Sequence, residues 1–201
     1  MDHSPPAPNP FNPGYYGSAE LRQFGFKRVG ENVSIARNAT IIGLENISIG
    51  NHVRIDGGVV LAAHSGFLVL GDYIHIGGGC YLGCGGGITL GDFAGLSQGV
   101  RVYSSTDDYS GAALTNPTVP AAYLNVKSAP VALGRHVIVG SGSVILPGVR
   151  IGEGSAVGAL SLVQRPLDEW GVYAGAPARR LKARSRALLE LEQALLAGKP
   201  N

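Results

Sequence analysis

The sequence carries an aliphatic side chain at every sixth position, and this period constrains the fold more than any other feature. One phase holds through the last third of the chain at Leu133, Val139, Ile145, Ile151, Val157 and Val163. The same spacing recurs in four earlier blocks, at Val29, Ile35 and Ile41, at Ile49, Ile55 and Leu61, at Leu70, Ile76 and Leu82, and at Leu90, Leu96 and Val102. A period of six fits neither a helix nor simple strand alternation, but it fits a strand of about four residues followed by a tight corner.

Three such units close a triangular coil, so the 18 positions predict an all-β solenoid of about six coils with the aliphatic side chains stacked inside. Gly, Asn and Asp follow these positions, as in IGNHV and LGDYI, and they tolerate the backbone conformations of tight corners. The alternative is a β-sandwich, which would show a period of two and turn signals about every 8–12 residues.

One large interruption breaks the repeat between Val102 and Leu133, and it predicts a loop over residues 103–130 that leaves the solenoid. The expected organisation is a tail and short capping helix over 1–28, the β-helix domain over 29–165, and a cap with a helix over 166–201. The first helix is expected over 18–24. The last is expected from Ser185, as its N-cap, to a stop at Gly198, Lys199 and Pro200.

Composition excludes several classes of protein. A hydrophobic content of 45% and a net charge of +2 exclude a disordered chain. Cys80 and Cys84 form neither a disulfide scaffold nor a zinc site, because no second cysteine pair accompanies them. The first 13 residues show no targeting signal, and the pI near 8.6 is too mild to indicate nucleic acid. We therefore expect a soluble cytoplasmic protein with no membrane or nucleic-acid partner.

The hexads, together with the motif YAGAPARRLK at 173–182, resemble the left-handed parallel β-helix acyltransferases of the hexapeptide-repeat superfamily. The resemblance covers roughly residues 29–183. Within the superfamily it points to the branch of sugar O-acetyltransferases and nucleotide-aminosugar N-acetyltransferases. It implies a left-handed coil, acetyl-CoA as acyl donor, a homotrimer, and active sites between neighbouring prisms.

The expected reaction moves an acetyl group from acetyl-CoA to the amino group of a nucleotide-linked amino-deoxysugar, such as a dTDP-3- or 4-amino-dideoxyhexose, for surface polysaccharide synthesis. Where related enzymes have a histidine base at the start of the loop, this chain has Asp107. A carboxylate is a weak base toward an alcohol, but it can orient an ammonium group and accept its proton. Acetylation of a sugar hydroxyl is the alternative, and it would need His75 or His64 as the base.

The resemblance places the acceptor near His75 and the glycine-rich stretch that follows it. His75 is expected on an outward-facing strand position two or more coils before the loop, as a second catalytic candidate. The acceptor-binding candidates are Asp108, Tyr109, Gly77, Gly85 and His64. Structural alternatives remain open: Asp107 and Asp108 suit an Asx-turn, the glycines suit tight corners, and His52 and His136 share an equivalent corner position.

The resemblance assigns CoA to the C-terminal coils, where Gly140, Ser141, Gly158 and Ala159 are expected to leave a narrow groove with free amides. Gly140 or a neighbouring amide is the candidate donor to the oxyanion. The CoA phosphates are expected at Arg165, Arg179, Arg180 and Lys182. Walker and Rossmann motifs are excluded because their sequence context is missing. No metal is expected, because the five histidines do not follow the three-histidine pattern of related carbonic anhydrases. A catalytically silent scaffold is the remaining alternative, and it would gain no stability from CoA.

Overall fold

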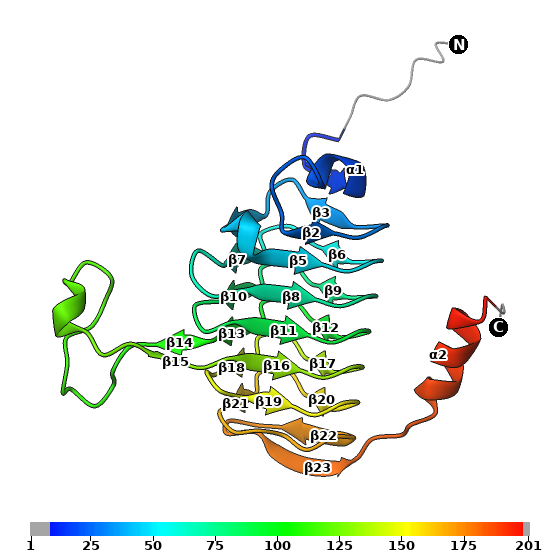
Figure 1. Ribbon diagram of the computed structural model, residues 1–201. Helices are drawn as coiled ribbons and strands as arrows, with labels where there is room; N and C mark the ends of the chain where they lie inside the picture. The colour runs from blue at the N-terminus through cyan, green and yellow to red at the C-terminus, as the bar shows by residue number, and fades with distance from the viewer. Residues whose placement is uncertain (1–8, 199–201) are drawn as a thin grey trace.

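Three parallel sheets form the walls of a triangular prism in the computed structural model, which describes residues 9–198 (Figure 1). The predicted tail over residues 1–8 and the predicted stop at Lys199 and Pro200 lie outside the described residues. In the first coil, residues 28–29, 34–36 and 40–42 belong to sheets B, A and C, and every complete coil passes through the three sheets in this order. The order defines the B–A, A–C and C–B corners. The left-handed parallel β-helix predicted from the sequence is confirmed.

Sheet A contains β1 (Tyr15–Gly17), β3 (Ser34–Ala36), β6 (Arg54–Ile55), β9 (His75–Ile76), β12 (Gly95–Leu96), β17 (Ile138–Val139), β20 (Ala156–Val157), β22 (Gly171–Ala174) and β23 (Arg179–Ala183). Sheet B contains β2 (Arg28–Val29), β5 (Ile47–Ile49), β8 (Leu68–Leu70), β11 (Ile88–Leu90), β16 (Val131–Leu133) and β19 (Arg150–Ile151). Sheet C contains β4 (Thr40–Ile42), β7 (Val60–Ala62), β10 (Tyr81–Gly83), β13 (Arg101–Tyr103), β18 (Val144–Ile145) and β21 (Leu162–Val163).

The side chains that the period of six places inside form the central part of the core, and further aliphatic residues such as Ile47, Leu68 and Ile88 pack beside them. Of the eighteen aliphatic positions, sixteen are buried, and Val29 and Ile41 in the first coil are partly buried. Parallel register stacks each on its equivalent in the next coil, as Ile55 lies on Ile76 and Ile76 on Leu96. Most strands have two or three residues rather than four, because the corners take up the rest of each hexad.

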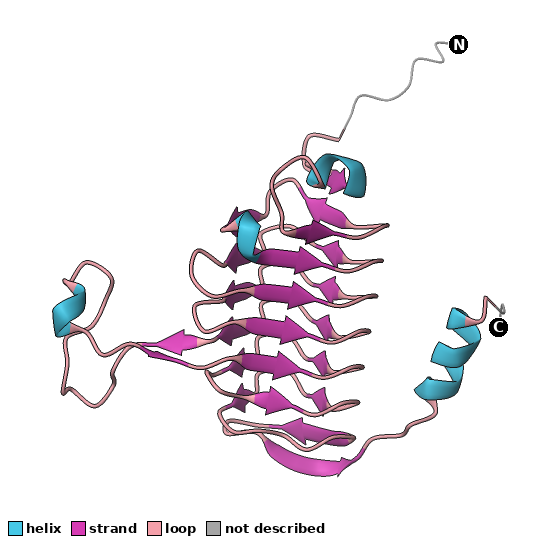
Figure 2. Cartoon of the chain, in the orientation of Figure 1, coloured by secondary structure: helices cyan, strands magenta, loops and turns pink. Residues whose placement is uncertain are grey.

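The solenoid has six complete coils and continues into part of a seventh. β22 pairs in parallel with β20, and β23 pairs antiparallel with β22 and covers that end (Figure 2). Tyr173 occupies the inward position under Val157 and is 4% exposed, while Trp170 is 7% exposed. The sequence predicts the end of the β-helix domain at residue 165, because Leu167, which pairs with Ile151, follows Val163 by four residues instead of six.

A column of stacked rings runs along the B–A corner. His52, Tyr73, Phe93 and His136 all have positive φ, between 56° and 60°, and neighbouring ring centroids lie 4.5 to 4.9 Å apart. The equivalent corner positions predicted for His52 and His136 are therefore confirmed. Stacking of flat rings helps to offset the cost of the left-handed backbone at each corner.

The two short helices differ from their predicted bounds. α1 covers Ser18–Leu21 only, and residues 22–24 continue as turns that end at Gly25, where φ is +93°. Its Leu21 is buried over the first coil. α2 covers Leu188–Leu196, and Ser185 is not its N-cap, since the cap position falls at Ala187. The segment before it is held to the prism by Arg184, which donates to the carbonyls of His136 and Gly154. No helix within residues 9–198 has the length and apolar character needed to cross a membrane.

The predicted loop leaves the prism between the fourth and fifth coils (Figure 1). Its base is a two-stranded antiparallel ribbon of β14 (Ser105–Thr106) and β15 (Lys127–Ser128), and its tip contains the 3-10 turn η2 (Ala121–Tyr123). A second 3-10 turn, η1 (Leu44–Asn46), lies between the first and second coils. The ribbon fixes the direction in which the loop projects, because it continues directly from β13.

α2 is attached to the B–A corner through Glu192. His136 Nε2 lies 3.0 Å from one Glu192 carboxylate oxygen, and Arg135 pairs with the other. Burial raises the pKa of Glu192, but hydrogen bonds from His136 and Arg135 outweigh it and hold that pKa below its usual value.

We expect the contribution of Glu192 to stability to be present above the ordinary carboxyl pKa and to be lost as pH falls through the lowered pKa of the folded state. Glu192→Gln should lower the melting temperature at neutral pH, and the difference from the wild type should shrink in acid. Thermal unfolding of both proteins from about pH 7 to pH 3 measures this. A difference that stays constant with pH would contradict the ion-pair explanation.

Candidate functional site

Small residues form a continuous column along the A–C corner. Gly77, Ser97, Gly140 and Gly158 each follow a strand of sheet A, and each amide donates to a carbonyl of the next coil at 2.7 to 2.9 Å. Glycine or serine occupies this first corner position in each coil from the third to the sixth, while the longer Gln98 side chain stands at the second position of the fourth coil. The column therefore leaves a narrow strip of accessible main chain.

The second residue at each of these corners has a free amide. Among the hydrogen bonds of residues 9–198, none uses the backbone N–H of Ser141 or Ala159 as donor. The Gly140 amide, expected to be available to an oxyanion, instead donates to the Val157 carbonyl, and the Gly158 amide donates to Tyr173. Of the two expected alternatives, the structure excludes the Gly140 amide, because the first corner amide is needed for the parallel ladder, and the neighbouring amide stays a prediction. Ser141 and Ala159 supply the free donors.

Close packing explains why Gly140 has no side chain. A Cβ at this position would collide with the backbone nitrogen of Ala159 in the coil below. We expect Gly140→Ala to destabilise the protein by about 1–3 kcal/mol, because the backbone would have to move. Gly95→Ala is the matched control, since a Cβ there would have nothing within 4 Å. Differential scanning calorimetry should show a lower melting temperature for the first variant only, and equal melting temperatures would refute this packing.

Basic side chains lie at the C-terminal end of this column. In the β22–β23 hairpin, Arg179 is opposite Ala174, Arg180 is opposite Tyr173 and Lys182 is opposite Val172, and all three basic residues are exposed. Arg165 is also exposed, but it follows β21 and lies at the far edge of sheet C. The structure thus brings three of the four predicted basic residues together and separates Arg165 from them.

A second group of predicted residues lies at the C–B corner, around the base of the loop. His64 is exposed and follows β7, and a Cβ on Gly85 would lie 2.9 Å from the Ser105 hydroxyl. Asp107 directly follows β14 and helps to line a cavity of about 660 Å³ between the loop and sheet C. Tyr81, Tyr103 and Leu146 contribute to the sheet side of this cavity. The cavity offers a carboxylate beside apolar and aromatic walls.

The two residues that follow Asp107 differ in environment. Asp108 is buried, and it accepts hydrogen bonds from the Ser110 amide at 3.0 Å and from the Ser110 hydroxyl at 2.9 Å. These contacts form the Asx-turn that the sequence offered as the structural alternative for Asp108. These bonds to Ser110, the backbone one first, hold the pKa of Asp108 below its usual value. Tyr109 is 93% exposed. The structure therefore gives Asp108 a turn-forming contact within the loop.

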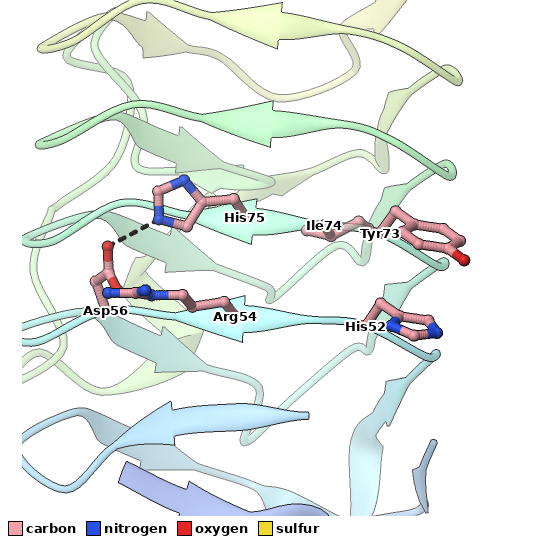
Figure 3. A pocket seen from close by; sticks show the side chains of 6 residues that line it. All are labelled: His52, Arg54, Asp56, Tyr73, Ile74 and His75. Atoms are coloured by element: carbon pink, nitrogen blue, oxygen red, sulfur yellow. Dashed lines mark hydrogen bonds and ion pairs between the residues drawn. The ribbon is translucent and has the colours of Figure 1, made fainter. Parts of the chain in front are cut away.

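A polar cluster surrounds His75 on the outer face of sheet A (Figure 3). Asp56 receives hydrogen bonds from His75 Nε2 at 2.8 Å, Arg54 Nε at 2.7 Å and the Tyr15 hydroxyl at 3.0 Å. Burial raises the pKa of Asp56, but these three bonds together outweigh it and keep that pKa below its usual value. His75 faces outward as predicted, but it lies in the third coil, one coil before the loop rather than two or more.

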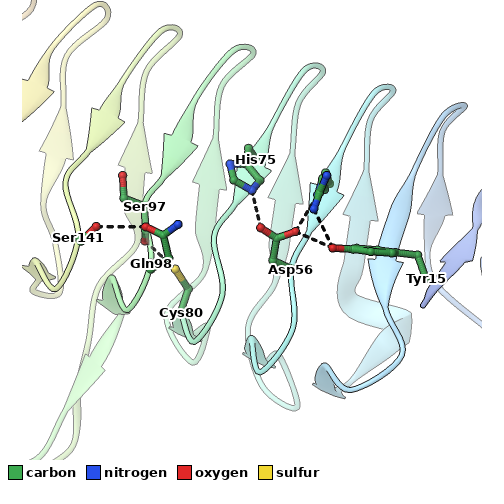
Figure 4. Close-up of polar contacts among 8 residues, drawn as sticks. Tyr15, Asp56, His75, Cys80, Ser97, Gln98 and Ser141 are labelled. Carbon is green, nitrogen blue, oxygen red and sulfur yellow. Dashed lines mark hydrogen bonds and ion pairs between the residues drawn. The ribbon is translucent and has the colours of Figure 1, made fainter. Parts of the chain in front are cut away.

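Figure 4 shows that this cluster and the small-residue column share one edge. Ser97 is half-buried, and its carbonyl accepts the Cys80 thiol at 3.1 Å, while the Ser141 hydroxyl donates to the Gln98 side chain at 3.3 Å. Sequence reasoning missed Ser97 and the partners of His75. The six-residue spacing could have identified Arg54 as a neighbour of His75, because both residues occupy the same position in their hexads. Tyr15 lies outside the repeat, so the period carries no information about it.

The predicted residues thus divide between two edges of sheet C. His75, Gly77 and the CoA candidates other than Arg165 lie toward the A–C corner, whereas Asp107, Gly85 and His64 lie toward the C–B corner. At about 3.3 Å per residue, the strand segment 100–104 spans roughly 13 Å between these corners. One small chemical group therefore cannot contact residues at both corners of the same chain. Within residues 9–198, no three His, Cys, Asp or Glu side chains form a group that could hold a metal ion.

Comparison with known proteins gives clear relatives, although no family model matches the chain. It is 45% identical over 178 residues to the dTDP-4-amino-4,6-dideoxy-D-glucose acyltransferase of Escherichia coli, covering 89% of this chain and 93% of that protein. It is 29% identical over 146 residues to the lipopolysaccharide biosynthesis O-acetyl transferase WbbJ of Escherichia coli K12, covering 69% of each.

Among solved structures, the chain is similar to AntD, an N-acyltransferase from Bacillus cereus. The identity is 46% and the TM-score is 0.88, over 93% of this chain and 98% of that one. AntD has been crystallised with dTDP and CoA, with dTDP and 3-hydroxybutyryl-CoA, and with dTDP-4-amino-4,6-dideoxyglucose and CoA. Its structures include variants at one serine and at one aspartate ten positions further along. The present chain belongs to the hexapeptide-repeat acyltransferases and, within them, to the family of nucleotide-aminosugar N-acyltransferases.

Proposed function

We propose that this protein transfers an acyl group from acyl-CoA to the 4-amino group of a dTDP-4-amino-4,6-dideoxyhexose. The observation that carries the proposal is 45% identity, over nearly the whole chain, to an enzyme named for that acceptor. The sequence left the 3-amino and 4-amino sugars open, and the relatives favour the 4-amino sugar. Acetyl-CoA remains the expected donor, and 3-hydroxybutyryl-CoA is a second donor to test.

The A–C corner column holds the pantetheine arm of CoA in this proposal. The free amide of Ala159 bonds one of its carbonyls, and the exposed Arg179, Arg180 and Lys182 bind its phosphates through charge-assisted hydrogen bonds. The thioester then lies near Ser97, in the N-terminal half of the column. Ser141 N–H is the candidate donor to the oxyanion of the tetrahedral intermediate.

Ser97 and Asp107 are the candidates for contact with the amine. They are the only serine and aspartate in the sequence with the ten-residue spacing of the positions varied in AntD. Asp107 accepts the proton that the sugar ammonium must lose. The neutral nitrogen then attacks the thioester carbonyl carbon, the C–S bond breaks, and the CoA thiolate leaves and takes up the proton that the attacking nitrogen loses as it becomes an amide.

In a homotrimer, the A–C corner of one protomer can lie beside the C–B corner of the next protomer. Because Ser97 and Asp107 lie at opposite corners of sheet C, we assign Asp107 at each site to the protomer next to the one that supplies Ser97. The projecting loop carries exposed Tyr109, Leu114 and Tyr123, which a neighbouring protomer would cover. The reaction belongs in a reducing compartment such as the cytoplasm, because Cys80 and Cys84 are free, buried thiols.

Acyl transfer to a sugar hydroxyl is the second candidate. The O-acetyl transferase relative and the pairing of His75 with the Asp56 carboxylate favour it, since a carboxylate-supported histidine is a common general base.

A thiol-release assay separates the two functions. Acetyl-CoA and 3-hydroxybutyryl-CoA are each supplied with dTDP-4-amino-4,6-dideoxyglucose or with its 4-hydroxyl analogue. The proposal predicts turnover with the amine and none above background with the hydroxyl sugar. Turnover with the hydroxyl sugar alone would establish O-acylation instead.

A further inference from the structure

The outer face of sheet A carries a row of positions that the CoA proposal does not use. Arg54, His75 and Gly95 are aligned on neighbouring strands, so their side-chain positions point outward in line. Arg54 and His75 are exposed, and a Cβ on Gly95 would meet nothing within 4 Å. An open surface therefore lies beside two potentially cationic side chains.

A shallow cavity of about 480 Å³ occupies this face (Figure 3). We call it the sheet A cavity, and it is lined by His52, Arg54, Asp56, Tyr73, Ile74 and His75. One end lies at the B–A corner, and the other lies next to Gly77 and the A–C corner. The cavity thus crosses the width of sheet A and ends where the small-residue column begins.

Asp56 orients the two cationic side chains of this cavity. It accepts from Arg54 Nε and His75 Nε2, and Tyr15 accepts from Arg54 Nη2 at 2.9 Å. Among the bonds of the described residues, none uses Arg54 Nη1 or His75 Nδ1. Figure 3 shows His75 Nδ1 on the side of the ring away from Asp56. One guanidinium N–H pair and, in the imidazolium form, one ring N–H are therefore left to bind an anion.

The B–A end of the cavity presents stacked aromatic rings. The rings of His52 and Tyr73 are parallel, with an interplanar angle of 3° and centroids 4.5 Å apart. Their edges and polar atoms form a wall that suits a planar heterocycle with its own donors and acceptors. The aromatic wall, the cationic pair and the corner at Gly77 follow one another across sheet A. A nucleotide-linked sugar has its base, diphosphate and sugar in the same order.

We infer that the sheet A cavity binds the nucleoside diphosphate of the acceptor, with the base beside His52 and Tyr73 and the diphosphate on Arg54 and His75. This orientation sends the attached sugar toward Gly77 and Ser97, where the proposed thioester lies. The inference rests on the proposed function, because it assumes a nucleotide-linked acceptor. It gives His75 a binding role and leaves proton transfer to Asp107.

Titration calorimetry with dTDP, and separately with CoA, tests the inference on the full-length protein. Arg54→Ala and His75→Ala should each raise the Kd for dTDP about tenfold or more, because each removes a charge-assisted hydrogen bond. Both should keep the wild-type Kd for CoA, which also shows that they fold. Arg150→Ala is the matched control, since Arg150 is exposed at the same hexad position on sheet B.

Wild-type affinity for dTDP in both variants would overturn the inference while leaving the proposed function intact. A different result, in which the wild type binds dTDP weakly and releases no thiol with the aminosugar, would overturn the proposed function itself. A loss of dTDP binding in Arg150→Ala equal to that in Arg54→Ala would show a general charge effect and would also overturn the assignment.

Discussion

Replacing Asp107 with asparagine is expected to lower kcat with the aminosugar by about 100-fold or more and to leave the KM for acyl-CoA unchanged. Asparagine keeps the size and the hydrogen-bonding oxygen of the side chain, but it cannot take a proton from the ammonium group. Asp107 lines the cavity between the loop and sheet C and is only partly exposed, so the variant should fold normally. Steady-state thiol release with varied concentrations of each substrate measures both constants.

Asp108→Asn is the control for this prediction. Asp108 is the next residue in the chain, but its oxygens are bonded to Ser110 in an Asx-turn, which asparagine also forms. We expect its kcat to remain within about threefold of the wild type, because the turn is preserved. An unchanged kcat in Asp107→Asn, or an equal loss in both variants, would remove Asp107 from proton transfer.

Replacing Arg179 and Arg180 together with alanine is expected to raise the KM for acyl-CoA about 10- to 100-fold, since two charge-assisted contacts with phosphate are lost. The KM for the aminosugar should not change, because these residues lie at the C-terminal end of the A–C column, far from the loop. The matched control replaces Lys27 and Arg28, an adjacent exposed basic pair at the opposite end of the prism. A similar rise in both double variants would indicate nonspecific electrostatic attraction rather than a CoA site.

The period of six predicted most of the fold because it reports directly on the inside of the prism. Sixteen of the 18 aliphatic positions assigned from spacing are buried, and the corner positions of His52 and His136 followed from the same count. The seventh coil was not predicted because its inward residue Leu167, which pairs with Ile151, follows Val163 by four residues instead of six. The first residue of α2 was not predicted correctly, because Arg184 holds the preceding segment to the prism and the helix begins only after Ala187 rather than after Ser185.

The site was harder to predict because its parts lie on different walls of the prism. Spacing placed Gly140 and Gly158 at one corner, but only the hydrogen-bond ladder shows that their amides are used and that the next amides are free. The pairing of Asp56 with His75 could not be predicted from the sequence, because the two residues meet only when their neighbouring coils stack. The separation of Ser97 from Asp107 depends on which corner releases the loop, and a linear pattern does not encode that.

The distance between Asp107 and the sugar amine in a crystal of the protein with CoA and the dTDP-4-aminosugar tests the central claim most directly. We predict a separation of about 2.6–3.2 Å, with Asp107 contributed by one protomer and the thiol of CoA lying against Ser97 and Ser141 of its neighbour. CoA bound away from the A–C corner, or an amine beyond hydrogen-bond reach of every Asp107, would contradict it.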